Sequence, residues 1–151
     1  MIQRLQTIFL LLTSVFYFSY WLFGLEWYER GYPVIIDIFN ESEYINTVLI
    51  TISFIPLIIT GISFVSIFVF KNRKLQMKLT QLGFRLSLVM SLFTIFYFYN
   101  CLSYLTELMP SKFLELLMYA AIVNPFICCY LLFLALKYIK RDNELINSLD
   151  R

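Results

Sequence analysis

Residues 45–70 read INTVLITISFIPLIITGISFVSIFVF, about 26 residues without an Asp, Glu, Lys, Arg or His. A helix rises about 1.5 Å per residue, so this stretch would be about 39 Å long, which exceeds the ~30 Å hydrocarbon layer of a bilayer. In lipid a chain must satisfy its own backbone hydrogen bonds, and a helix does so. The stretch predicts a tilted or projecting membrane-spanning helix that bends at Pro56.

Three further charge-free runs lie at about residues 7–24, 86–105 and 116–136. Each is close to the ~20 residues that a spanning helix needs. The composition agrees. With 60% hydrophobic and only 15% charged residues, the chain is more apolar than a soluble domain of this length could bury. The sequence predicts an all-α integral membrane four-helix bundle, a single domain over residues 1–151. The first run is expected to be a retained helix, because it is long for a signal peptide, aromatic and followed by no A-x-A-like site.

The basic residues divide unequally between the two sides of this bundle. The side that carries both termini has Arg4, Lys71, Arg73, Lys74, Lys78, Arg85, Lys137, Lys140, Arg141 and Arg151. The other side has Arg30 and Lys112. Basic residues collect in cytoplasmic loops, so both termini are predicted to lie in the cytoplasm.

Small and polar residues recur on one face of several runs. Small residues allow helix backbones to approach closely in lipid, so these faces are predicted to point into the bundle. The stripes are Asn46, Ser53 and Thr60 in the second run, Ser87, Ser91, Thr94 and Cys101 in the third, and Ala121, Asn124, Pro125, Cys128 and Ala135 in the fourth.

Asn100 and Asn124 are the candidate intramembrane polar contacts. Asn124 precedes Pro125, which frees a backbone carbonyl one turn earlier, so the pair could contact a ligand or an ion. Asparagines in spans also form interhelical hydrogen bonds worth about 0.5–2 kcal/mol, and this second role is the one we expect.

Reactive groups are scarce in the sequence. It contains no histidine, which removes His-ligated haem or zinc and Ser-His or Cys-His pairs. Cys101, Cys128 and Cys129 fall inside spans, where they are expected to act as small hydrophobic residues. The net charge of +2 does not indicate nucleic-acid binding. We expect no catalytic residues, no cofactor, no metal site and no enzymatic activity.

The segments between the runs carry the remaining signals. Residues 25–44 are expected to form an outer loop, with a short strand or a headgroup-layer segment over Val34 to Phe39; it is either a docking surface or an aromatic belt with solvating acids. Residues 71–82 read KNRKLQMKLTQL, and with Leu86 their leucines have helical spacing. They predict an interfacial helix or a helical extension of the spans. The tail from Lys137 repeats this pattern with Leu145, Ile146 and Leu149, so short cytoplasmic helical extensions are expected.

Three cytoplasmic segments resemble a known family: MIQRLQTIFLLL at 1–12, RKLQMKL at 73–79 and LALKYIKRDNELINSLDR at 134–151. The chain resembles, over essentially its whole length, a family of small four-span membrane proteins of Bacteroidota, domain-of-unknown-function family 4293. The resemblance implies a multi-pass protein of the bacterial inner membrane and supplies no catalytic residues. The matched positions are Gln3, Arg4, Arg73, Lys74, Leu75, Gln76, Lys140, Asp142 and Asp150.

All of these matched positions lie on the predicted cytoplasmic side. They suggest a shared contact face there, with Arg4, Arg73, Lys74, Gln76, Lys140 and Asp142 as its candidate residues. Its contact would be made within the chain or with a partner protein.

These observations favour a non-enzymatic accessory, assembly or scaffold subunit of an inner-membrane complex. Its partners would be membrane lipids and a membrane protein or further copies of the chain. One alternative is a protein that binds or transports a lipid or quinone between the aromatic-rich first and third helices. The walls would be Phe16, Tyr17, Tyr20 and Trp21 facing Phe93, Phe96, Tyr97 and Tyr99. Another alternative is a channel, which four spans could build only as an oligomer.

Overall fold

The described chain is almost entirely helical in a computed structural model that covers residues 2–39, 43–108 and 111–149, with side chains for 5–24, 29–39, 44–108 and 111–145. This confirms the all-α prediction. The helices are α1 (Ile2–Ile38), α2 (Glu43–Ser53), α3 (Ile55–Phe68), the short 3-10 helix η1 (Val69–Lys71), α4 (Arg73–Glu107) and α5 (Lys112–Leu149). By length and composition, four stretches can cross a membrane: Leu5–Gly24, Tyr44–Lys71, Arg73–Glu107 and Lys112–Leu145.

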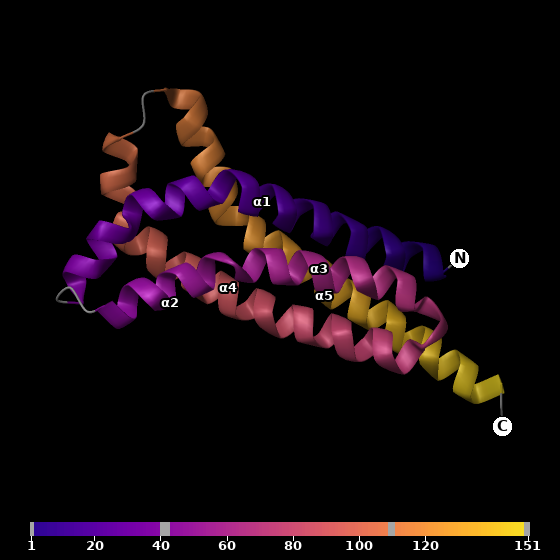
Figure 1. Cartoon of the computed structure of the whole chain (residues 1–151). Coiled ribbons are helices and arrows are strands. Elements are labelled where there is room, and N and C mark those ends of the chain that lie inside the picture. The colour runs from indigo at the N-terminus through magenta and orange to yellow at the C-terminus, as the bar shows by residue number, and fades with distance from the viewer. Residues whose placement is uncertain (1, 40–42, 109–110, 150–151) are drawn as a thin grey trace.

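The helices form an elongated bundle (Figure 1). Both α1 and α4 pack mainly on α3 and α5. The start of α1, η1 with the start of α4, and the end of α5 lie at one end of the bundle, and the α1–α2 and α4–α5 connections lie at the other. We call the first of these the basic end, because its described side chains include Lys71, Arg73, Lys74, Lys78, Lys137, Lys140 and Arg141.

The second span is broken at Phe54, between α2 and α3. Pro56 has no N–H, so the carbonyl of Ile52 loses its usual helical partner. Just before it, the Phe54 N–H donates to the Thr51 carbonyl at 3.3 Å, three residues back rather than four, which makes a tighter turn than an α-helix. The sequence therefore predicted the position of the bend. In the structure the bend is a break between two helices.

Helix α1 is longer than the sequence predicted. The loop expected from residue 25 is wrong, because α1 continues to Ile38, and the strand expected over Val34 to Phe39 is wrong, because this segment is helical to Ile38 and Phe39 lies in a turn. Tertiary contacts hold the extra turns: Ile35 is buried, and the Tyr32 hydroxyl donates to the Leu49 carbonyl of α2 at 3.3 Å. Burial raises the pKa of the Tyr32 phenol, so it stays protonated as a donor. Trp27 and Tyr28, two of the aromatics of the expected docking loop or belt, lie outside the described side chains.

The segment at 71–82 is a helical extension, since α4 begins at Arg73 and runs on through the third span. The Asn72 side chain caps it, accepting a hydrogen bond from the Leu75 N–H at 3.2 Å. Polar and small residues of this extension face the bundle, whereas its leucines face outward: Gln76 and Thr80 are buried, and Leu75 and Leu82 are exposed. In the tail, α5 continues to Leu149, but Ile146 and Leu149 lie outside the described side chains.

The interior combines large apolar side chains with hydroxyls. Buried hydroxyls such as those of Thr80 and Thr94 donate to the carbonyl four residues earlier in their own helix, which satisfies them without a partner helix. The Tyr17 and Ser87 hydroxyls bond across the core at 2.7 Å and join α1 to α4. Most stripe residues face inward as predicted, but Asn46 is exposed. The buried members include Ser53, Ser87, Ser91, Thr94, Cys101, Pro125, Cys128 and Ala135.

Gly31 permits a close approach of α1 to α4. A Cβ at this position would overlap the Tyr97 hydroxyl and lie 2.7 Å from its Cζ, and Tyr97 is fully buried. Gly61 on α3 is a matched control, because a Cβ there would meet nothing within 4 Å.

We expect Gly31→Ala to lower the stability of the detergent-solubilised protein by about 1–3 kcal/mol, because the added methyl overpacks a rigid contact. Gly61→Ala should raise stability by about 0.5–1 kcal/mol, because alanine favours the helix. Thermal unfolding followed by circular dichroism measures both. Equal melting temperatures for the two variants would contradict the contact.

Candidate functional site

An ion pair at the basic end joins two candidate contact residues that are far apart in the sequence. Arg73 starts α4 and Asp142 lies in the last turns of α5, and their guanidinium and carboxylate groups are paired. The side chains are only 14% and 16% exposed. A pair so little exposed is screened less by salt than a surface pair, and removing one partner leaves the other charge uncompensated.

Two side-chain amides tie the remaining helices at this end. The Gln76 amide donates to the Ser66 carbonyl at 3.0 Å and links α4 to α3. The Gln6 amide donates to the Tyr138 carbonyl at 3.2 Å and links α1 to α5. Together with the ion pair, these bonds connect all four spanning helices. Gln6 was not among the residues predicted from the sequence, although a polar amide directly before the apolar first run was a usable signal.

Two further candidate contact residues at this end, Lys74 and Lys140, point outward. Lys74 is exposed, and so is Lys140, whose ammonium lies 3.9 Å from the Glu144 carboxylate. Such an exposed pair contributes little stability. The side chain of Arg4 lies outside the described residues. Arg73, Gln76 and Asp142 thus form contacts within the chain, whereas Lys74 and Lys140 point outward. We call the exposed cations of this end the basic platform: Lys71, Lys74, Lys78, Lys137, Lys140 and Arg141.

The two candidate asparagines occupy different environments and are not brought together. The Asn124 amide of α5 donates to the Phe16 carbonyl of α1 at 3.0 Å, and its oxygen accepts a bond from the Cys128 thiol at 3.3 Å. The Asn100 amide donates to the Phe96 carbonyl of its own helix at 2.7 Å. Asn124 therefore joins two helices, whereas Asn100 bonds locally.

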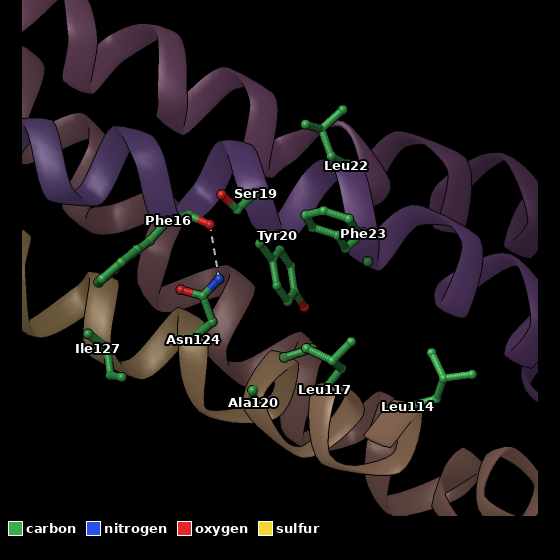
Figure 2. Close-up of a pocket in the computed structure, with 12 residues that line it drawn as sticks. Phe16, Ser19, Tyr20, Leu22, Phe23, Leu114, Leu117, Ala120, Asn124 and Ile127 are labelled. Atoms are coloured by element: carbon green, nitrogen blue, oxygen red, sulfur yellow. Dashed lines mark hydrogen bonds between the residues drawn. The ribbon is translucent and has the colours of Figure 1, made fainter. Parts of the chain in front are cut away.

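A groove of about 480 Å³ opens between α1 and α5 beside Asn124 (Figure 2). We call it the α1/α5 groove. Its lining is mostly apolar: Phe16, Ser19, Tyr20, Leu22, Phe23, Gly24, Leu114, Leu117, Ala120, Ala121, Asn124 and Ile127. A second hollow of about 430 Å³ lies between α4 and α5 and is lined by residues such as Phe84, Leu88 and Tyr130.

The groove differs from the lipid or quinone site expected between the first and third helices. Tyr17 and Tyr97 are fully buried in the core, and Tyr99 is 87% exposed, so these aromatics do not form facing walls. The groove uses Phe16 and Tyr20 of the first helix but pairs them with the fourth. The physical reason is that α1 packs more extensively on α5 than on α4.

The described side chains offer little to coordination or redox chemistry. No group of three or more His, Cys, Asp or Glu among them is placed to hold a metal ion. All three cysteines are free thiols, and Cys101 donates to the Gly31 carbonyl at 3.5 Å.

We expect Arg73→Ala to lower the unfolding free energy in detergent by about 2 kcal/mol, because it leaves the half-buried Asp142 carboxylate without its partner. The exposed neighbour provides the control, and Lys74→Ala should change stability by less than about 0.5 kcal/mol. Exchanging the pair, Arg73→Asp with Asp142→Arg, should restore part of the loss. Equal melting temperatures for Arg73→Ala and Lys74→Ala would show that the Arg73–Asp142 pair does not stabilise the fold.

We expect Asn124→Leu to destabilise the bundle by about 1 kcal/mol, because it removes the bond to the Phe16 carbonyl between α1 and α5. Asn100→Leu is the matched control and should have a smaller effect, because its bond lies within one helix. Thermal melting in detergent compares them, and a larger loss for Asn100→Leu would contradict the assignment.

Comparison with known proteins is consistent with this picture. The family described as a domain of unknown function, DUF4293, matches residues 2–151. A comparison with curated proteins gave no match, and a comparison with solved structures gave none either. Because the match covers nearly the whole chain, the chain belongs to the DUF4293 family.

Proposed function

We propose that the chain is a non-enzymatic accessory, assembly or scaffold subunit of a bacterial inner-membrane complex, whose basic end faces the cytoplasm and docks a partner protein. The observation that carries this proposal is the basic platform, exposed on an end whose four helices are tied together by the Arg73–Asp142 pair and the Gln76 and Gln6 amide bonds. Because these contacts already fix the helix ends, docking would require little further ordering.

The lengths of the helices support a contact role outside the hydrocarbon layer. Helices α1, α4 and α5 have 37, 35 and 38 residues. At about 1.5 Å per residue each is more than 50 Å long, whereas the hydrocarbon layer is ~30 Å thick. Several turns of each therefore extend into the headgroup layer or the water beyond, where charged side chains are well solvated.

The charge of the basic end indicates the chemistry of the partner. Two acids lie among its described side chains: Asp142 is paired with Arg73, and Glu144 lies near Lys140. The other cations of the basic platform remain available for an acidic surface, which would attract a partner electrostatically and fix its orientation.

The interior supports a role without catalysis. Leu10, Tyr17, Met90 and Leu132 fill the space between the helices and are fully buried. A channel built by this chain would consequently need several copies around a shared axis.

The proposal is tested by quantitative affinity purification from native membranes with protein mass spectrometry. We expect Lys74→Glu with Lys140→Glu to reduce the co-purified partner by about ten-fold, because reversing two exposed charges opposes an acidic surface. The matched control is Arg30→Glu with Lys112→Glu, two exposed cations at the opposite end, which should retain the partner.

A topology check accompanies this test, since charge reversals can reorient a membrane protein. In a variant without the three native cysteines, an impermeant thiol reagent should label a cysteine at Asn40 but not one at Asn72 in intact spheroplasts. Equal recovery of the partner with both charge-reversed variants would refute docking at the basic end, as would the absence of a stoichiometric protein from the unmodified sample.

A further inference from the structure

We propose that the α1/α5 groove holds one acyl chain of a glycerophospholipid from the leaflet next to the α4–α5 connection. This inference is independent of the contact proposed for the basic end, because the groove lies away from that end. It rests on the depth of the groove, its walls and an exposed cation at the level of its mouth.

The groove spans about the depth of one leaflet. On α1 its lining runs from Phe16 to Gly24, within the candidate span Leu5–Gly24. Eight residues of helix rise about 12 Å, which is close to half of a ~30 Å hydrocarbon layer. On α5 the lining runs from Ile127 to Leu114, also within a candidate span.

The two ends of the groove differ. At the deep end the Asn124 amide bonds to the Phe16 carbonyl, which holds α1 and α5 together. Toward the α4–α5 connection, Leu114 and Leu117 of α5 stand apart from Phe23 of α1 across an open space (Figure 2). Gly24 and Ala120 contribute almost no side-chain bulk, which leaves room for a ligand along the helices.

The walls of the groove suit a hydrocarbon chain. Phe23 is 73% exposed and Leu22 is 52% exposed, so the groove opens sideways toward the surrounding lipid. A spanning helix is surrounded mainly by the acyl chains of lipids. An acyl chain in close contact with the aromatic and leucine side chains of the groove gains dispersion attraction. The volume of about 480 Å³ lies within the range of small-molecule sites.

The geometry favours a lipid chain over a partner helix. A helix with its side chains is about 10 Å wide and must cross the whole layer. The Asn124–Phe16 bond closes this groove partway across, so a helix could not lie along its length.

An exposed cation lies at the depth where the groove opens. Lys112 begins α5 two residues before Leu114, so it stands at the level of the mouth but on another face of the helix, from which its long side chain can reach lipid phosphates. Cations at this depth attract lipid phosphates. Glu115 is nearby, and its carboxylate accepts a hydrogen bond from the Tyr119 hydroxyl at 3.3 Å.

Photolabelling tests the proposal in vesicles of palmitoyl-oleoyl phosphatidylethanolamine and phosphatidylglycerol. A fraction of the phosphatidylglycerol carries a diazirine near the end of one acyl chain, and mass spectrometry maps the labelled residues. We expect labelling at Ala121, a half-buried lining residue that lipid would reach through the groove.

Ala120→Phe should lower the labelling at Ala121 by about ten-fold, because the ring fills the space of the chain. Ala120 is exposed, so this substitution leaves the core unchanged. Val123→Phe is the matched control, because Val123 is 51% exposed on the same helix and does not line the groove. It should leave the labelling at Ala121 as in the unmodified chain.

Three outcomes would overturn the proposal. The first is labelling of Val123 and Leu116 but not of Ala121, which would mean that lipid does not enter. The second is loss of the Ala121 label when a few mole per cent of menaquinone is added, which would assign the groove to an isoprenoid molecule. The third is protection of Ala121 with cross-linked dimers at high protein-to-lipid ratio, which would assign it to a second copy.

Discussion

In a hydrocarbon layer there is no hydrophobic driving force for apolar helices to associate. The bundle must therefore be held together by other contacts. Leucine and phenylalanine side chains contact acyl chains about as favourably as they contact each other. They therefore cover the outside of the bundle, where residues such as Leu92 and Phe64 are exposed. The contacts that distinguish the bundle from separate helices are close approaches and polar bonds. Gly31 lets α1 approach α4, and the Tyr17–Ser87 and Asn124–Phe16 bonds link helices inside the span.

The sequence predicted four long apolar helices because the physical signal is local. A run without charges is visible in the sequence itself, and so is Pro56, where the second span breaks. The length of α1 was not predictable in the same way. Residues after Gly24 mix acids, aromatics, Gly31 and Pro33, a composition typical of loops. They remain helical because Gly31 meets Tyr97 and Tyr32 bonds to Leu49, and such contacts depend on neighbours far along the chain.

The candidate site was predicted as a set of residues but not as an arrangement. Arg73, Gln76 and Asp142 were identified from the basic segments that resemble the family, but nothing in their spacing shows that Arg73 pairs with Asp142 or that Gln76 reaches Ser66. The α1/α5 groove arises where two helices diverge beyond the Asn124–Phe16 bond, a feature of packing angles that a one-dimensional pattern does not contain. The sequence thus predicts which residues lie in lipid and which lie in water. It predicts less well which residues contact one another in the fold.

The Arg73–Asp142 pair also has a consequence for biogenesis. Arg73 begins the helix of the third span, whereas Asp142 follows the fourth, so synthesis must pass the fourth span before the arginine meets its carboxylate. Until then the nascent chain holds a guanidinium without this counter-charge. The turns of α5 around Asp142 therefore act as a latch that closes only after the fourth span has been made.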